Sequence, residues 1–268
     1  MALTDRTRWL LRVGALGYLG VLVMVPLGMI FFRTFEDGLV AFWEQVTTPA
    51  SISAISLSLI IVAIVVPLNV VFGVVTALAL ARGRFRGRRI VETIVDLPFA
   101  VSPVVVGVSL VLLWGVDGWF GGLADHGIRI IFSLPGMVIA TIFVTLPFVV
   151  REVEPVLHEI GDEQEQAAAT LGASWRQTFW RITLPAIRWG LLYGVVLTVA
   201  RALGEFGAVL VVSAGVSGES QTLTLLVHAR YIDDHNVFGA YAASTVLMAL
   251  AILALVLMTL LNRKRESA

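Results

Sequence analysis

Two residues of opposite charge, Arg201 and Glu205, stand within an otherwise apolar segment of the chain. Four residues apart on a helix, they share one face, although the order with arginine first is the less favourable one in isolated helices. A charge near the middle of a membrane span costs about 2.5–3.5 kcal/mol on insertion scales. The pair could be a gate in a translocation pathway or a lock between packed helices. We favour a paired Arg201 over a free anion site, because conduction requires exit as well as entry.

A second group of residues, Asp96, Ser102 and Pro103, lies in another apolar segment together with Pro98. Prolines in a membrane helix release backbone hydrogen bonds and bend the helix, and the freed groups are tolerated beside a cavity. Asp96, Ser102 and Pro103 are therefore candidate pathway residues. The alternative is a proline-kinked packing helix with Asp96 at its capped end.

The sequence does not support other kinds of chemistry. The chain has no cysteine, which excludes disulfides, thiolate metal sites and cysteine nucleophiles. Its four histidines lack the spacing of metal ligands. The Gly-Lys-Ser/Thr sequence of a phosphate-binding P-loop is missing, since the single lysine is Lys264. We expect a non-catalytic chain that binds no metal or cofactor of its own.

The composition places these residues in a membrane. Hydrophobic residues make up 58% of the 268 residues and charged residues only 14%, against about 25% charged in soluble domains. Apolar runs recur that are long enough, as helices, to cross about 30 Å of hydrocarbon. We predict an all-α integral membrane protein with six transmembrane helices, at Leu10–Phe32, Ile52–Ala81, Leu97–Val116, Ile130–Val150, Trp189–Ser213 and Val237–Leu261.

The basic residues predict the orientation, because Lys and Arg are retained on the cytoplasmic side. With both termini inside, most of the 19 Lys and Arg residues are cytoplasmic, and only Arg33, Arg129 and Arg230 lie outside. The arginine run at 82–89 is explained by this topology and by lipid headgroups, so we do not expect nucleic acid as a partner.

The cytoplasmic connection at 151–188 has the composition of a structured element. Asp162 and Glu165 have the spacing of a capping box, which predicts the start of a short helix. Gly172 then interrupts that helix, because glycine permits a turn that other residues resist. An apolar stripe at helical spacing follows, formed by Leu171, Trp175, Phe179 and Ile182. From physics alone, two short helices joined at a glycine or an amphipathic helix on the membrane surface are both open.

The segment QAAATLGASWRQTFWRITLP, from Gln166 to Pro185, resembles the loop motif of binding-protein-dependent ABC importer permeases of type I. Gln166 replaces the glutamate of that motif, and Glu165 stands one position earlier. The resemblance implies the type I ABC importer permease fold and a coupling helix that seats on a separate ATPase. The residues it implicates in ATPase coupling are Glu165, Gln166, Ala167, Ala168, Leu171, Gly172, Ile182, Leu184 and Pro185.

The resemblance also divides the chain into three parts. Residues 1–50 would hold the N-terminal tail, the first transmembrane helix and an outer loop. Residues 51–262 would form the ABC importer type 1 transmembrane domain, with its coupling loop at 151–188. Residues 263–268 would be a cytoplasmic tail.

Three further stretches are similar to the W type of sulfate/thiosulfate importer permease: DLPFAVSPVVVG, TLPFVVRE and RWGLLYGVVLTVARALGEFGAV. The last contains a core that molybdate permeases share. The resemblance implies sulfate or thiosulfate import by alternating access across a bacterial inner membrane. It implies as partners two copies of the ATPase, which bind ATP and Mg²⁺, a second permease of the T type and an extracytoplasmic sulfate-binding protein. A molybdate/tungstate importer, or an ion-coupled secondary transporter using Glu205, remains the alternative.

Overall fold

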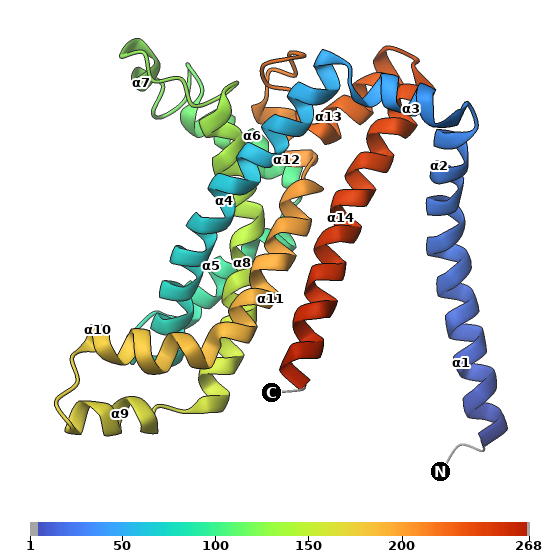
Figure 1. Cartoon of the computed structure of the whole chain (residues 1–268). Helices are drawn as coiled ribbons and strands as arrows, with labels where there is room; N and C mark the ends of the chain where they lie inside the picture. The colour runs from blue at the N-terminus through green and yellow to red at the C-terminus, as the bar shows by residue number, and fades with distance from the viewer. Residues whose placement is uncertain (1–4, 267–268) are drawn as a thin grey trace.

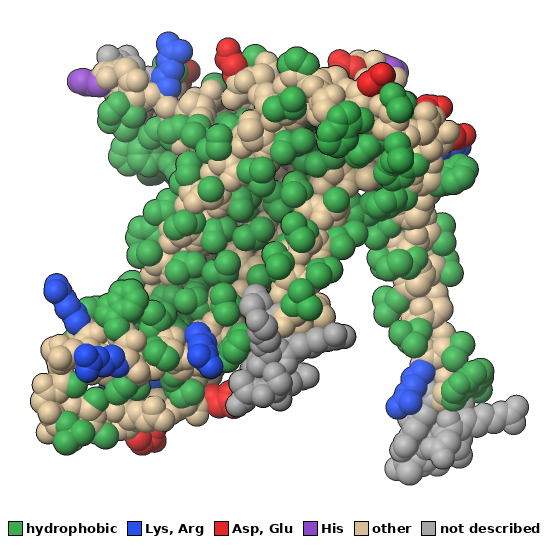
Figure 2. All heavy atoms as spheres, in the orientation of Figure 1, with side chains coloured by type: hydrophobic (Ala, Val, Ile, Leu, Met, Phe, Trp, Pro, Cys, Tyr) green, Lys and Arg blue, Asp and Glu red, His purple; other side chains and the backbone are tan. Residues whose placement is uncertain are grey.

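The computed structural model describes residues 5–266, without the side chains of residues 5–8, 124, 125, 258 and 261–266. Over this range every regular element is a helix, which confirms the all-α prediction (Figure 1). The tail proposed at 263–268, with Arg263, Lys264 and Arg265, lies outside the described side chains, as do Arg6 and Arg8. Figure 2 shows apolar side chains over the middle of the visible face, with charged side chains toward its two ends, as a membrane span requires.

Within residues 5–266, five helical stretches are long and apolar enough to cross a membrane. The first runs from Trp9 to Phe35 and combines α1 (Asp5–Leu19), the π-helical turn η1 (Gly20–Met24) and α2 (Val25–Phe35). The others contain α4 (Pro49–Arg82), α8 (Leu134–Ile160), α11 (Leu184–Leu203) and α14 (Val237–Glu266). The short outer elements are α3 (Gly38–Val46), α7 (Gly122–Asp125), α13 (Leu223–His228) and the π-helical turn η3 (Ala229–Asp233).

The predicted third span is not one helix. It is divided into α5 (Arg88–Ala100) and α6 (Pro103–Trp114), which meet at an angle of 113°. The break falls at Val101 and Ser102, both of which have an extended backbone. A residue that precedes a proline is driven out of the helical region, and Pro103 is then well suited to open the next helix. Pro103 was expected to bend a continuous helix, but the helix ends before this proline.

Two other predicted spans had wrong boundaries. Helix α8 continues to Ile160, so the first part of the expected cytoplasmic loop extends a span. The predicted fifth span, Trp189–Ser213, starts too late and ends too late, because α11 begins at Leu184 and ends at Leu203. A separate short helix, α12 (Gly207–Val212), follows. Gly204, at the end of α11, leaves the helical conformation with a ψ of 4°.

Small residues bring the central helices close together. Helices α4, α8 and α11 lie side by side in the body of the molecule (Figure 1). A Cβ added to Gly73 of α4 would lie 2.6 Å from Cβ of Val149 on α8, and one on Gly107 of α6 would lie 2.7 Å from Cβ of Val211 on α12. Such spacing explains why glycine stands there. The first span stands apart and meets the body only toward α2, where Oγ1 of Thr34 lies 2.8 Å from Oγ1 of Thr245 (Figure 1).

A buried arginine, Arg230, joins the ends of two spans. Arg230, in η3, donates hydrogen bonds to the carbonyl of Gly239 on α14 (3.0 Å), to Oγ1 of Thr48 (2.9 Å) and to Oγ of Ser51 on α4 (2.8 Å). Burial lowers the pKa of Arg230, while the charge of Asp234 opposes that shift. Arg230 therefore joins the outer ends of α4 and α14.

Replacing Arg230 with methionine is expected to destabilise the fold. The change leaves buried oxygen acceptors without a donor, which costs about 2–3 kcal/mol in total. Thermal unfolding of the purified protein in detergent should show a midpoint several degrees below that of the parent. Arg129→Met, at an exposed position, is the matched control and should shift it little. Equal shifts for both variants would show that the buried hydrogen bonds of Arg230 do not matter.

Candidate functional site

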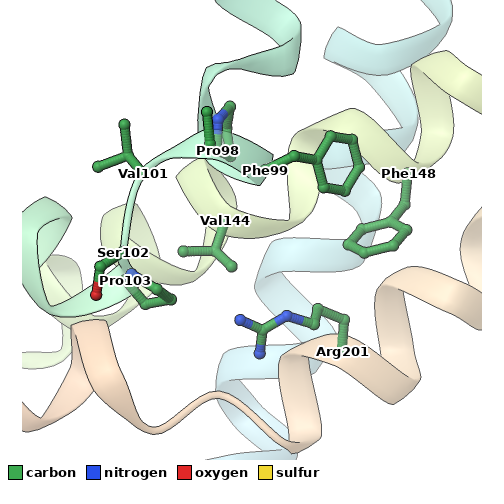
Figure 3. A pocket seen from close by; sticks show the side chains of 9 residues that line it. Pro98, Phe99, Val101, Ser102, Pro103, Val144, Phe148 and Arg201 are labelled. Atoms are coloured by element: carbon green, nitrogen blue, oxygen red, sulfur yellow. The ribbon is translucent and has the colours of Figure 1, made fainter.

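A cavity of about 390 Å³ opens where α5 and α6 separate. Its wall is formed by the α5–α6 break, by Val144 and Phe148 on α8, and by Arg201 on α11. Figure 3 shows the Arg201 side chain extending toward Pro103 and Ser102, with Phe99 and Phe148 beside each other at the opposite end. Their ring centroids are 5.6 Å apart. The structure thus brings together three of the predicted pathway residues, Ser102, Pro103 and Arg201.

Arg201 and Glu205 form an ion pair, with 2.8 Å between Nη2 and Oε2. The Glu205 side chain is 1% exposed and that of Arg201 is 34% exposed, so the carboxylate is buried while the guanidinium reaches the cavity. The pair does not lie within one helix, as the spacing suggested, because α11 ends at Leu203. Glu205 instead occupies the break between α11 and α12.

Glu205 also holds the second helix break in place. Its Oε1 accepts a hydrogen bond from the amide of Ala208 in the first turn of α12 (2.9 Å), and its carbonyl accepts one from Oγ1 of Thr224 on α13 (2.8 Å). A carboxylate at a helix N-terminus is stabilised by the unpaired amides and by the helix dipole. One side chain thus pairs with Arg201 and starts α12.

The two helix breaks lie against each other. A Cβ added to Gly207, the first residue of α12, would be 3.2 Å from Cβ of Pro103, the first residue of α6. The N-terminal ends of α6 and α12 therefore meet near the cavity. The end of α6, which lines the cavity, carries partial positive charge, whereas that of α12 is already bound by the Glu205 carboxylate. Together with the guanidinium of Arg201, this arrangement suits an anion better than a cation.

Asp96 does not line this cavity. It is in the interior of α5, not at a helix start, and pairs with Arg151 of α8 at 2.9 Å (Nε–Oδ1) and 2.5 Å (Nη2–Oδ2). This pair borders a separate hollow of about 180 Å³ that also contains Glu92 and Glu154. Arg151 was not among the predicted residues, because only the packing of α5 on α8 brings it to Asp96.

The loop that was predicted to be cytoplasmic forms the two predicted short helices. They are α9 (Glu163–Thr170) and α10 (Trp175–Thr178), and α10 continues through the π-helical turn η2 (Phe179–Thr183) into α11. The turn between them contains Gly172, with a φ of +81°. Figure 1 shows this loop projecting beyond the spans, at the end where α1 begins and α14 ends.

The tip of the loop is exposed and partly apolar. Leu171 is 89% exposed and Trp175 is 75% exposed, and Gln166 and Ala167 on α9 are exposed as well. A hollow of about 270 Å³ lies beside this tip. Its lining combines Leu171, Gly172 and Ala173 with Gln177, Thr178, Arg181 and Ile182. The tip offers the shape and exposure of a docking surface.

The expected capping box on α9 was wrong. Asp162 makes no capping hydrogen bond, and Glu165 points to other elements, accepting from Nε of Arg82 (3.1 Å) and from Oγ1 of Thr183 (2.8 Å). The capping box is on α10, where Ser174 and Gln177 exchange hydrogen bonds. The Ser-x-x-Gln spacing at 174–177 was a signal for it that sequence reasoning missed.

The end of the motif joins this loop to a span. Ile182 lies in η2, Leu184 begins α11 and Pro185 is in the first turn of α11. Leu184 packs against a buried cluster that includes Val153 of α8 and Ile187. A proline at this position is favourable because the first helical amides have no partner within the helix.

Comparisons with known proteins agree with this architecture. Residues 69–267 match the family described as "Binding-protein-dependent transport system inner membrane component". The chain is 49% identical over 262 residues to the "Sulfate transport system permease protein CysW" of Synechocystis sp., covering 97% of this chain and 95% of that one. It is 34% identical to the "Sulfate transport system permease protein CysT" of the same organism, covering 92% and 86%.

A solved structure shares the fold. It is the "Crystal structure of bacterial alginate ABC transporter in complex with alginate pentasaccharide-bound periplasmic protein". A chain of that structure aligns with a TM-score of 0.74 at 21% identity, covering 95% of this chain and 93% of its own. At this identity the likeness concerns the fold alone.

Proposed function

We propose that this chain, which belongs to the family of binding-protein-dependent transport system inner membrane components, is a permease subunit of an ABC importer for sulfate and thiosulfate. The main support for sulfate as the transported anion is the 49% identity to a sulfate permease over nearly the full length of both chains. The cavity at the α5–α6 break supports it, because Arg201 and the N-terminus of α6 at Pro103 offer positive charge to a dianion there.

In this proposal Arg201 acts as a gate at the helix breaks. Its ion pair with Glu205 offsets the cost of placing the guanidinium in the membrane and weakens its hold on a passing anion. The anion would pass Ser102 and Pro103 as the cavity opens alternately to the two sides of the membrane. Asp96 is paired with Arg151 and lies outside this cavity, so it would act on the pathway from outside the cavity.

Import would be driven by two copies of a separate ATPase, which bind ATP and Mg²⁺. The exposed tip at Leu171 and Gly172, with Gln166 and Ala167 on α9, is the proposed docking surface. Ile182, Leu184 and Pro185 would carry its movement into α11. This chain itself would not hydrolyse ATP.

The other proposed partners are a second permease of the T type and an extracytoplasmic sulfate-binding protein. The first span, Trp9–Phe35, is exposed and stands apart from the body of the molecule, which supports a second membrane subunit beside it (Figure 1). We place the chain in a bacterial inner membrane with both termini cytoplasmic. The docking loop supports this orientation, since it lies at the same end as the start of α1 and the end of α14.

Uptake of labelled sulfate by a strain that lacks this subunit tests the function. Returning the gene should restore uptake, with competition by thiosulfate, and the ATPase should co-purify with the chain. Uptake should stop when ATP is depleted and continue when the proton gradient is dissipated; the reverse would indicate a secondary transporter. Restored molybdate uptake without sulfate uptake would overturn the cargo and leave the architecture standing.

A further inference from the structure

The last turn of α4 contains an arginine with three acceptors on two other elements. Arg82 donates to the carbonyl of Leu157 (2.8 Å) and to that of Gly161 (2.5 Å), at the end of α8. It also donates through Nε to Oε2 of Glu165 on α9 (3.1 Å). The last carbonyls of a helix have no partner within the helix, so Arg82 satisfies groups that α8 leaves open.

The second oxygen of the Glu165 carboxylate contacts a third element. Oε1 accepts a hydrogen bond from Oγ1 of Thr183 (2.8 Å), a buried residue at the end of η2. The Arg82 and Glu165 side chains are each 21% exposed, so water screens their ion pair only in part. One carboxylate thus links α4, α9 and the start of α11.

Helix α9 has little else to fix its position. None of its eight residues, all of which the structure describes, is buried. A helix of this length is marginal without tertiary packing. Because α9 has no buried apolar face, the hydrogen bonds of Glu165 are the contacts that orient it relative to the spans.

Helix α4 is suited to carry a displacement across the membrane. Its 34 residues span roughly 51 Å at 1.5 Å per residue. Ser51, near its outer end, is hydrogen-bonded to Arg230, and Arg82 stands at its inner end. The helix is therefore fastened by a buried or half-buried arginine at both ends.

We propose that Arg82 and Glu165 are positioning residues that form a clamp, through which the docking loop and α4 move as one body. The inference rests on the proposed ATPase-driven import. It gives Glu165 a role different from the docking contact that its place in the motif suggested: the carboxylate faces its own chain, and the exposed part of α9 is left to the ATPase. Without the clamp, the ATPase would still bind, but its closure would turn α9 without displacing α4.

The test uses the assembled importer with both permeases, the ATPase and the binding protein in vesicles. The measured quantity is the amount of labelled sulfate imported per ATP hydrolysed, in Arg82→Ala, Glu165→Ala and the double variant. We expect each single variant to retain the ATPase and to lower this ratio at least tenfold. The double variant should be no worse than the more impaired single variant, because the two residues act as a unit. Glu159→Ala, at an exposed site on α8, is the control and should leave the ratio unchanged.

Two further measurements distinguish the loss of the clamp from a general folding defect. Glu165→Gln keeps one acceptor oxygen, for Arg82 or for Thr183 but not for both, and loses the charge, so it should fold and give an intermediate ratio. Since the chain has no cysteine, a single spin label at Gln164→Cys can report the mobility of α9, which should rise in Arg82→Ala.

An unchanged ratio, unchanged label mobility, additive losses in the double variant or loss of the ATPase from the single variants would overturn the clamp. Failure of the unmodified importer to bind the ATPase or import sulfate would instead overturn the proposed function.

Discussion

Replacing Gly172 with valine is expected to lower sulfate import at least tenfold while the membrane helices remain folded. Gly172 has a φ of +81°, a conformation that costs L-residues about 1–2 kcal/mol and is worst for β-branched side chains. Space is not the obstacle, since a Cβ built on Gly172 has no atom within 4 Å. Backbone strain, and not a steric clash, would therefore be the cause of the loss. Valine would reshape the turn and misalign α9 with α10.

Gly172→Asn is the matched comparison, because asparagine has a similar size but tolerates the left-handed conformation. It should keep import within about threefold of the parent. Thermal unfolding of the purified chains checks that both variants retain the spans. Equal losses for asparagine and valine would place the cause in a side-chain contact with the ATPase. Full import by the valine variant would remove the turn from the coupling mechanism.

The predicted pathway residues illustrate how far residue types and spacing alone can predict a site. Mid-membrane charge and paired prolines were enough to select Arg201, Ser102 and Pro103, which meet in one cavity, because polar groups are tolerated in a membrane only at such places. Asp96 was selected for the same reason, yet it lies apart, in an ion pair with Arg151. Its partner is on another helix, and spacing along one helix contains no information about which helices pack together.

The predicted helix boundaries were wrong for a related reason. Hydropathy marks where a segment is apolar, whereas the backbone ends a helix where local conformation requires it, as at Ser102 and Gly204. The side chain of Glu165 likewise shows that local spacing does not predict tertiary contacts. Its spacing from Asp162 fits a local cap, but Arg82 and Thr183 offer charged and buried partners, and these tertiary contacts prevail.

Arg201→Gln alone is expected to destabilise the chain strongly. It leaves the carboxylate of Glu205, whose side chain is 1% exposed, without its cationic partner. Removing one member of a buried ion pair costs about 3–5 kcal/mol. The amount of assembled importer recovered from membranes should therefore fall. Adding Glu205→Gln should restore it, because a glutamine oxygen at 205 can still accept the hydrogen bond from Ala208 and no charge is left buried.

The double variant then separates the two roles that the sequence left open for the pair. If Arg201 is a gate that offers charge to the anion, the assembled double variant should import sulfate at less than about a tenth of the parent rate. The neutral cavity no longer compensates for water lost by a dianion between the α6 and α12 N-termini. Import per assembled complex, measured with labelled sulfate, decides the question. Parental import by the double variant would mean that the pair only locks α11 to α12.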